Sequence, residues 1–195
     1  MNKTIRLAIL GSTNGTDMQT IIDAIADERL DASIEAVISN RSNAYILERA
    51  RKQGIQAIHI SHKGKHRKDF DAEISRVLQE KKVDLILLIG FMRILSKEFC
   101  REWSDHILNV HPSLLPKYAG GMDSNVHAEV LQNKEVETGC TIHFVTEQVD
   151  GGPILVQKTC PVEPDDSVAS LKSKVQKLEG EAFLEAIKMI QKRLY

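Results

Sequence analysis

Hydrophobic and polar residues follow two alternating patterns along the chain. Short apolar runs of strand length are each followed by a polar or glycine-containing loop. Segments whose apolar residues recur every three or four positions then follow, as on one face of a helix. The strand-like runs cover residues 5–10, 34–38, 55–60 and 83–89, and the helical segments start near 18 and cover 44–53 and 68–81. This alternation predicts a Rossmann-like α/β fold, an open and mostly parallel sheet with helices on both faces.

The second half of the chain predicts the other edge of this sheet. A strand at 107–111 precedes a short helix at about 126–133, strand-like runs at 138–145 and 153–161, and a last helix that opens at 165–167. A short turn joins the last two strands, which predicts a C-terminal antiparallel hairpin. The sequence therefore predicts about seven strands in a single domain covering residues 1–195, without internal repeat or linker.

Composition narrows the kinds of function that the chain can have. Of its 195 residues, 42% are hydrophobic and 27% charged, with a formal net charge of -1 and no basic block, so we expect no binding to nucleic acid. No apolar run has the length of a signal sequence or a membrane span, so we expect no membrane association and a cytoplasmic protein. We expect a monomer or a homodimer. The widely spaced Cys100, Cys140 and Cys160 are interpreted as buried apolar residues, not disulfide partners or metal ligands.

The first candidate site is the loop Gly11-Ser-Thr-Asn-Gly-Thr-Asp17. A glycine-containing loop between a strand and a helix offers free backbone N–H groups to an anion, which is typical of a phosphate site. Gly15 allows close approach of a ligand, and Thr16 adds a hydroxyl donor. The carboxylate of Asp17 would repel a phosphate unless it points away, as it would if Asp17 capped the helix. A plain turn with Thr16 or Asp17 as the N-cap is an alternative interpretation.

The second candidate site is the stretch Ile107-Leu-Asn-Val-His-Pro-Ser-Leu-Leu-Pro-Lys-Tyr118, in which an apolar strand runs into a loop with two prolines. Asn109 and His111 are two residues apart, so in a strand their side chains project to the same side. An imidazole can give or take a proton near neutral pH, and an amide can donate a hydrogen bond to a developing oxyanion. The pair suits addition to a carbonyl. A capped strand end with a structural histidine is the alternative.

The third candidate site is the turn Asp150-Gly-Gly-Pro153. Its carboxylate can reach a neighbouring strand end, where His111 is the natural partner, and such a pair would raise the pKa of the imidazole and fix its orientation. A turn aspartate that bonds its own backbone is the alternative. His143 is either a neighbour of this site or an ordinary sheet histidine. His62 and the other scattered histidines are expected to be solvated.

These loops are expected to meet at one edge of the sheet. The run at 83–89 is apolar without alternation, as a central parallel strand should be, and it ends in Gly90-Phe-Met-Arg-Ile-Leu95. In open parallel sheets, ligands collect outside the carboxyl ends of the strands. The Gly11 loop, the Gly90 loop and the strand end with Asn109 and His111 should therefore share one rim.

Two of these motifs together resemble the signature of the folate-dependent formyltransferase family: Asn109-Val-His-Pro-Ser-Leu-Leu-Pro116 and Asp150-Gly-Gly-Pro153. Gly90-Phe-Met-Arg-Ile-Leu95 and the Gly-Ser-Thr-Asn-Gly loop narrow the resemblance to phosphoribosylglycinamide formyltransferases. It covers nearly the whole chain, from about Ile5 to the last helix. It implies transfer of a formyl group from the cosubstrate 10-formyltetrahydrofolate to the amine of glycinamide ribonucleotide (GAR), a step of purine biosynthesis, without a metal.

The resemblance also implies roles for individual residues, with nucleotide binding in the N-terminal part and folate binding and catalysis in the C-terminal part. The implied catalytic set is Asn109, His111 and Asp150. The residues implied at GAR are Gly15, Thr16, Asp17 and Glu179, the first three matching a phosphate-binding Gly-Ser-Asn of which two residues are changed. The residues implied at the folate are Phe91, Met92, Arg93, Ile94, Leu95 and Arg67. The chain departs from the family pattern at 119–127, where many members have Pro-Gly-Leu-His.

Other interpretations remain open at this stage. Methionyl-tRNA formyltransferase shares the catalytic trio that corresponds to Asn109, His111 and Asp150, but it needs a basic surface for tRNA and carries a further domain. Formyltetrahydrofolate deformylase is hydrolytic and carries an N-terminal regulatory domain. A non-catalytic nucleotide-binding module, built on the Gly11 loop alone, would leave Asn109, His111 and Asp150 without a joint purpose.

Overall fold

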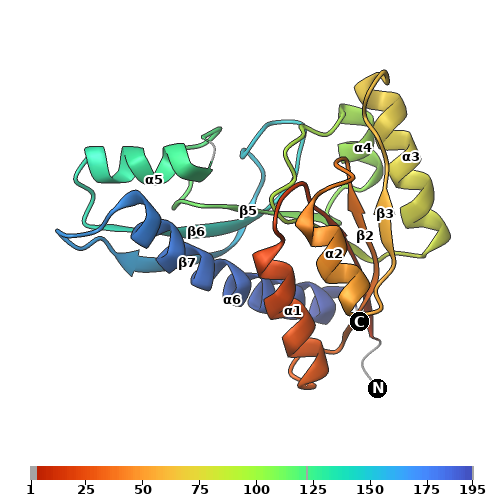
Figure 1. Ribbon diagram of the computed structural model, residues 1–195, viewed down its shortest axis with the longest axis horizontal. Coiled ribbons are helices and arrows are strands. Elements are labelled where there is room, and N and C mark those ends of the chain that lie inside the picture. The colour runs from red at the N-terminus through yellow and green to blue at the C-terminus, as the bar shows by residue number, and fades with distance from the viewer. Residues whose placement is uncertain (1–3, 122, 195) are drawn as a thin grey trace.

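The computed structural model describes residues 4–121 and 123–194, which form one seven-stranded sheet with helices packed on it (Figure 1). The strand order is β3-β2-β1-β4-β5-β6-β7. Neighbouring strands from β3 to β5 are parallel, whereas β6 is antiparallel to β5 and β7 to β6. The predicted mostly parallel sheet with a C-terminal antiparallel hairpin is confirmed. Met122, in the segment that departs from the family pattern, lies outside the described residues.

The elements follow the predicted alternation. The strands are β1 (Ile5–Leu10), β2 (Ala32–Ser39), β3 (Ala57–His59), β4 (Leu85–Leu88), β5 (Ile107–His111), β6 (Glu137–Phe144) and β7 (Ile154–Pro161). The helices are α1 (Thr16–Ala26), α2 (Tyr45–Lys52), α3 (Arg67–Glu80), α4 (Lys97–Glu102), α5 (Asp123–Gln132) and α6 (Val168–Leu194).

The central strands are buried on both faces, which explains their uninterrupted apolar sequences. Successive side chains of a strand point to opposite faces. In β1, Leu7 and Ile9 pack into the core beneath α1, α2 and α6, whereas Ala8 and Leu10 pack into the core beneath α3 and α4. Full burial of a Leu or Ile side chain contributes about 1.5–3 kcal/mol. Both cores therefore hold the strands firmly, and with them the loops at their carboxyl ends.

The long helix α6 crosses α1 at close range and extends toward β7 (Figure 1). At Gly180 a Cβ atom would lie 2.6 Å from Thr20 Oγ1, so the absence of a side chain permits this close crossing. Glu179, the neighbouring residue, is 8% exposed. The crossing therefore brings one face of α6 next to the N-terminus of α1.

Three local features differ from the sequence predictions. The helix α4 was not predicted; Ser96 is its N-cap, and the Ser96 hydroxyl accepts a hydrogen bond from the Phe99 N–H at 3.3 Å. The strand β3 has three residues where six were predicted. The N-cap of α1 is Gly15, so the alternative that Thr16 or Asp17 caps this helix is wrong.

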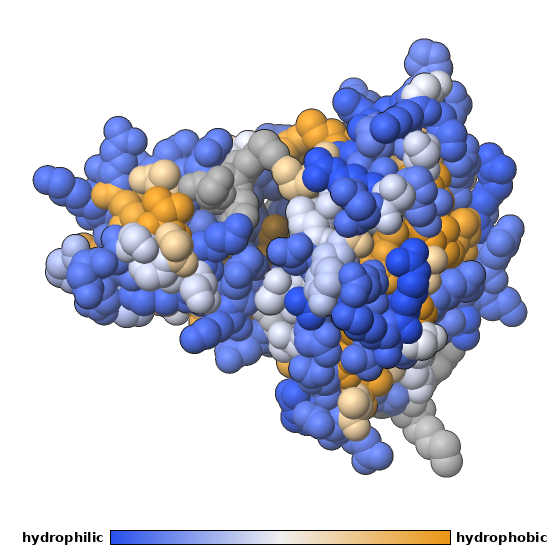
Figure 2. Space-filling model, in the orientation of Figure 1, coloured by the Kyte–Doolittle hydropathy of each residue, from blue (hydrophilic) through white to orange (hydrophobic). Residues whose placement is uncertain are grey.

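The surface is hollowed between the projecting part that carries α5 and the body that carries α1 and α2 (Figure 2). A side-chain cluster of Val126, Val130 and Leu171 joins α5 to the start of α6. In the described part of the chain, no helix is long and apolar enough to cross a membrane.

Candidate active site

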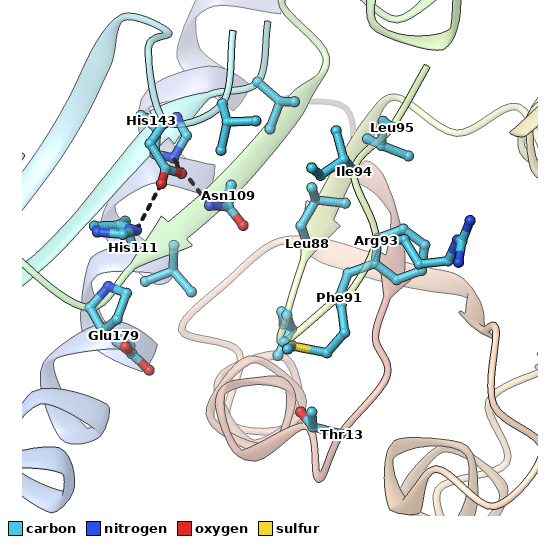
Figure 3. Close-up of a pocket in the computed structure, with 18 of the residues that line it drawn as sticks. Thr13, Leu88, Phe91, Arg93, Ile94, Leu95, Asn109, His111, His143 and Glu179 are labelled. Carbon is cyan, nitrogen blue, oxygen red and sulfur yellow. Dashed lines mark hydrogen bonds and ion pairs between the residues drawn. The ribbon is translucent and has the colours of Figure 1, made fainter. Parts of the chain in front are cut away.

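A cavity of about 840 Å³ lies at the carboxyl ends of β1, β4 and β5. Its walls are the loop after β1, the loop after β4, the end of β5 with the loop that follows, the turn between β6 and β7, and one face of α6. The prediction that the Gly11 loop, the Gly90 loop and the Asn109/His111 strand end share one rim is therefore confirmed. Figure 3 shows side chains from these segments facing a common space.

The first wall is the N-terminus of α1. Gly15 has the left-handed backbone conformation, with φ 67° and ψ 42°, and caps α1 without a side-chain hydrogen bond. The first N–H groups of an α-helix have no partner within the helix, so this end of α1 can donate to an anion in the cavity. Asp17 lies in the first turn and is 6% exposed. Gly15, Thr16 and Asp17 all line the cavity.

Gly15 should be among the least replaceable glycines of the chain. A Cβ atom there would lie 2.3 Å from Ile46 Cγ1, whereas at Gly54, which has the same left-handed conformation with φ 68°, it would meet nothing within 4 Å. Gly54→Ala should cost about 1–2 kcal/mol of stability from left-handed strain alone. Gly15→Ala should cost about 1–3 kcal/mol more because it also overpacks the core.

Urea unfolding of both glycine variants measures this difference. The variant at Gly54 serves as the matched control because it carries the same backbone strain without the contact with Ile46. Equal unfolding midpoints for the two variants would contradict the close packing of the Gly15 loop on α2.

The second wall brings the predicted trio together. The Asp150 carboxylate lies 3.3 Å from His111, measured from Oδ2 to Nδ1, and accepts a hydrogen bond from the Gly120 N–H at 2.7 Å. His111 Nε2 lies 2.9 Å from the Tyr118 carbonyl oxygen. Because a carbonyl oxygen only accepts, Nε2 carries a proton, and a second proton on Nδ1 would make an imidazolium–carboxylate pair with Asp150.

His143 belongs to the same cluster and fixes the orientation of Asn109. The two residues pair across β5 and β6. His143 Nδ1 donates to the Phe144 carbonyl at 2.9 Å, so in the neutral ring Nε2 accepts, and it lies 3.1 Å from Asn109 Nδ2. His143 Nε2 also lies 3.5 Å from Asp150 Oδ1. The Asn109 amide therefore gives one N–H to His143 and keeps the other for an oxygen in the cavity.

Burial and the neighbouring polar groups act in opposite directions on the pKa values of His111 and Asp150. Burial lowers the pKa of His111 below its ordinary value and outweighs the raising effects of the Asp150 charge and the Tyr118 carbonyl. The predicted raising effect of Asp150 on the pKa of His111 is present, but the net shift is downward because the loss of hydration exceeds the attraction of one carboxylate. Burial raises the pKa of Asp150, but contact with His143, the Gly120 N–H and the charge of His111 bring the net pKa below its ordinary value.

An NMR titration of the His111 ring tests this balance. We expect a pKa below the ordinary 6.5, and a lower value still in Asp150→Asn, because the Asp150 charge raises the pKa of His111. As pH falls between 6.5 and the lowered pKa, the unfolded chain binds the proton more readily than the folded protein, so His111 makes folding less favourable. A pKa above 6.5, or a rise in Asp150→Asn, would contradict the dominance of burial.

The third wall is the loop after β4. Phe91, Met92, Arg93, Ile94 and Leu95 all line the cavity. Met92 and Ile94 are 42% and 56% exposed, so this loop presents apolar side chains at the surface of the site. The Arg93 guanidinium points away from the trio (Figure 3). It lies over the Phe70 ring, 5.4 Å from its centre.

Two parts of the site differ from what the sequence suggested. Arg67 is exposed at the start of α3 and is not among the residues that line the cavity. Lys172 and Gln176 were not predicted, yet they line the cavity together with Glu179 from one face of α6. Their spacing of four and three residues is the helical signal that could have found them.

The described residues contain no group of three or more His, Cys, Asp or Glu side chains placed to hold a metal ion. Among the cysteines, only Cys100 lines the cavity. Burial raises the pKa of its thiol, so Cys100 is held as the unreactive thiol form.

Comparison with known proteins places this geometry in a family. Residues 5–187 match the formyl transferase family model. The chain is 40% identical over 184 residues to the phosphoribosylglycinamide formyltransferase of Haemophilus influenzae, covering 94% of this chain and 85% of that protein. It superposes on the glycinamide ribonucleotide transformylase 1 of Symbiobacterium toebii with a TM-score of 0.92 at 37% identity, covering 97% of this chain and 88% of that one.

A longer relative contains a similar segment. The chain is 45% identical over 188 residues to the trifunctional purine biosynthetic protein adenosine-3 of Drosophila melanogaster, which covers 95% of this chain but only 14% of the length of that protein. The matched region thus spans about a seventh of this longer relative. The family match includes β1, the Gly90 loop, the trio and most of α6. From this match and from the site that its residues build, the chain belongs to the formyl transferase family.

Proposed function

We propose that this protein is a phosphoribosylglycinamide formyltransferase, which transfers the formyl group of 10-formyltetrahydrofolate to the amine of GAR in the cytoplasm. The products are formyl-GAR and tetrahydrofolate. The observation that carries the proposal is the convergence of Asn109, His111 and Asp150 in one cavity beside the N-terminus of α1. The 40% identity to a phosphoribosylglycinamide formyltransferase supports the choice of substrates.

The walls of the cavity suit the two substrates in different places. The N-terminus of α1 can bind the phosphate of GAR through backbone N–H groups, and the Glu179 carboxylate can accept hydrogen bonds from the ribose hydroxyls. Across the cavity from Asn109 and His111, Leu88, Phe91 and Leu95 form an apolar wall against which a flat folate ring can pack (Figure 3). The GAR amine and the formyl carbon would then meet at the trio.

Asn109 is proposed to stabilise the negative oxygen that forms when the amine attacks the formyl carbon. Its amide already gives one N–H to His143, which holds the group in place, and the other N–H can reach a formyl oxygen. A preorganised donor of this kind is worth about 2.7–4 kcal/mol in the transition state. His111 adds a positive charge to the same region only in its protonated form, which its lowered pKa restricts to acidic pH.

Asp150 is proposed to move the proton that the transfer requires. The new bond joins the GAR nitrogen to the formyl carbon, the bond from that carbon to the folate nitrogen breaks, and one proton passes from the first nitrogen to the second. Asp150 is ionised at neutral pH because its pKa is lowered, so it can orient an ordered water that carries this proton. His111, held between Asp150 and the Tyr118 carbonyl, keeps the carboxylate in position.

An absorbance assay with 10-formyl-5,8-dideazafolate tests the proposed function. Deformylation of the folate should require the protein and GAR together, and omission of GAR should stop it. Folate product without GAR would identify a hydrolase. No turnover with both substrates, while GAR still binds, would leave a non-catalytic nucleotide-binding module.

A further inference from the structure

Ser12 connects the first and third walls of the cavity, which are the N-terminus of α1 and the loop after β4. It lies two residues after the end of β1, is 2% exposed, and precedes the segment 13–17, which forms the first wall together with the N-terminus of α1. The Ser12 N–H donates to the Gly90 carbonyl at 3.0 Å. The Ser12 hydroxyl oxygen accepts a hydrogen bond from the Met92 N–H at 2.9 Å. The backbone and the side chain of Ser12 are thus both hydrogen-bonded to the loop after β4, which forms the third wall.

The direction of these bonds is fixed by a third residue. The Ser12 hydroxyl has a single proton, and it donates this proton to Asn40 Oδ1 at 2.6 Å. Asn40 is 6% exposed, and its Nδ2 lies 3.3 Å from His62 Nδ1. His62 is half-buried and edge-on to Phe70, so it is only partly solvated. The lone pairs of Ser12 are therefore left for the Met92 N–H.

The two walls also touch directly beside Ser12. Gly90 has a left-handed backbone with φ 59°, and a Cβ atom there would lie 2.3 Å from Thr13 Oγ1. A side chain at Gly90 would push the two loops apart. A small displacement of the segment 13–17 must therefore either carry the Gly90 loop with it or break the bonds that Ser12 makes.

We propose that Ser12 is a positioning residue that couples the two substrate subsites, so that each substrate tightens the binding of the other. The proposal rests on the proposed function, which assigns GAR to the first wall, at the N-terminus of α1, and the folate to the third wall, the loop after β4. An anion that orders the segment 13–17 orders Met92 through the Ser12 hydroxyl, and the wall that receives the folate is then already in place. By thermodynamic linkage the effect is reciprocal.

Calorimetric titration with 5,8-dideazafolate, a folate without a formyl group to transfer, measures the coupling as the ratio of Kd without and with saturating GAR. In the wild type this ratio should be roughly fivefold or more, within the range of ordinary allosteric coupling. In Ser12→Ala it should fall to about one, even though each ligand still binds alone. Ser12→Cys, which keeps the volume but has a weaker donor and acceptor, should fall between the two.

Ser75→Ala is the matched control. Ser75 is 4% exposed, and its hydroxyl also donates to one side chain, Glu102 at 2.5 Å, and accepts from another, Trp103 Nε1 at 2.9 Å, but it does not line the cavity. This variant should lose comparable thermal stability and keep the wild-type coupling. Full coupling in both Ser12 variants, or none in the wild type, would overturn the proposal while leaving the proposed function intact. Failure of GAR and 5,8-dideazafolate to bind the wild type would overturn both.

Discussion

Replacing Asp150 by asparagine should lower kcat by roughly a thousandfold, within the range of 10²–10⁴ that a positioned acid or base contributes. Asparagine keeps the shape of the side chain, but its neutral amide carries no negative charge and cannot draw the amine proton through a bound water. The Gly120 N–H would keep an oxygen acceptor. Steady-state kinetics should therefore show a collapse of kcat with the KM for both substrates changed much less.

Asp166→Asn supplies the comparison for this variant. Asp166 is also an ion-paired carboxylate, 2.6 Å from Lys174 Nζ, but it lies outside the cavity. Its substitution should leave kcat at the wild-type level. If Asp150→Asn kept most of its turnover, the assignment of proton transfer to Asp150 would be wrong.

Replacing Asn109 by alanine should lower kcat by about a hundredfold to a thousandfold, the usual effect of removing one oxyanion donor. The loss should appear in kcat more than in KM, because the amide donates to an oxygen whose charge develops only in the transition state. Binding of 5,8-dideazafolate, which forms no such oxygen, should stay near the wild-type affinity. Stopped turnover with this binding intact is the result expected of an oxyanion donor.

Asn109→Ala also leaves His143 Nε2 without its 3.1 Å partner. A second variant must therefore separate the loss of this contact from the loss of the oxyanion donor. His143→Leu removes the same contact from the other side, because leucine has no acceptor, while it keeps the Asn109 amide. It should cost less turnover than Asn109→Ala. A larger loss in His143→Leu would show that the contact matters more for holding the site together than for stabilising the oxyanion.

The fold was predictable because its signal is spread over many residues. Apolar runs such as β4 report burial on both faces, and the alternation of strands and helices leaves few topologies open. The six-residue α4 was missed because so short a helix shows hardly two turns of periodicity. Its one local signal was Ser96, a residue type that favours N-caps.

The candidate site was predictable where residues are close in sequence or end a strand. Asn109 and His111 lie on one side of a strand by their spacing alone. Asp150 could be predicted because it begins a glycine-rich turn that can reach a neighbouring strand end. The alternative N-cap at Thr16 or Asp17 was wrong because sequence preference favours those residue types at N-caps, whereas the packing of Ile46 that leaves no room for a side chain at Gly15 comes from another element. The hydrogen bond between Ser12 and Met92 joins residues 80 positions apart, and no local sequence pattern indicates such a contact.

The sign of the His111 pKa shift could not be predicted for a related reason. A sequence suggests a charge partner, here Asp150, but it does not give the degree of burial. His111 is 3% exposed in the folded protein. That loss of hydration, which comes from the packing of several segments, outweighs the single carboxylate.

The most direct test of the account is to follow an isotope-labelled formyl carbon from 10-formyltetrahydrofolate during turnover by the wild-type protein with GAR. The account predicts that the label appears in the amide of formyl-GAR, in equal amount to the tetrahydrofolate produced, and that Asp150→Asn slows both together. Label recovered as free formate, with GAR unchanged, would contradict it.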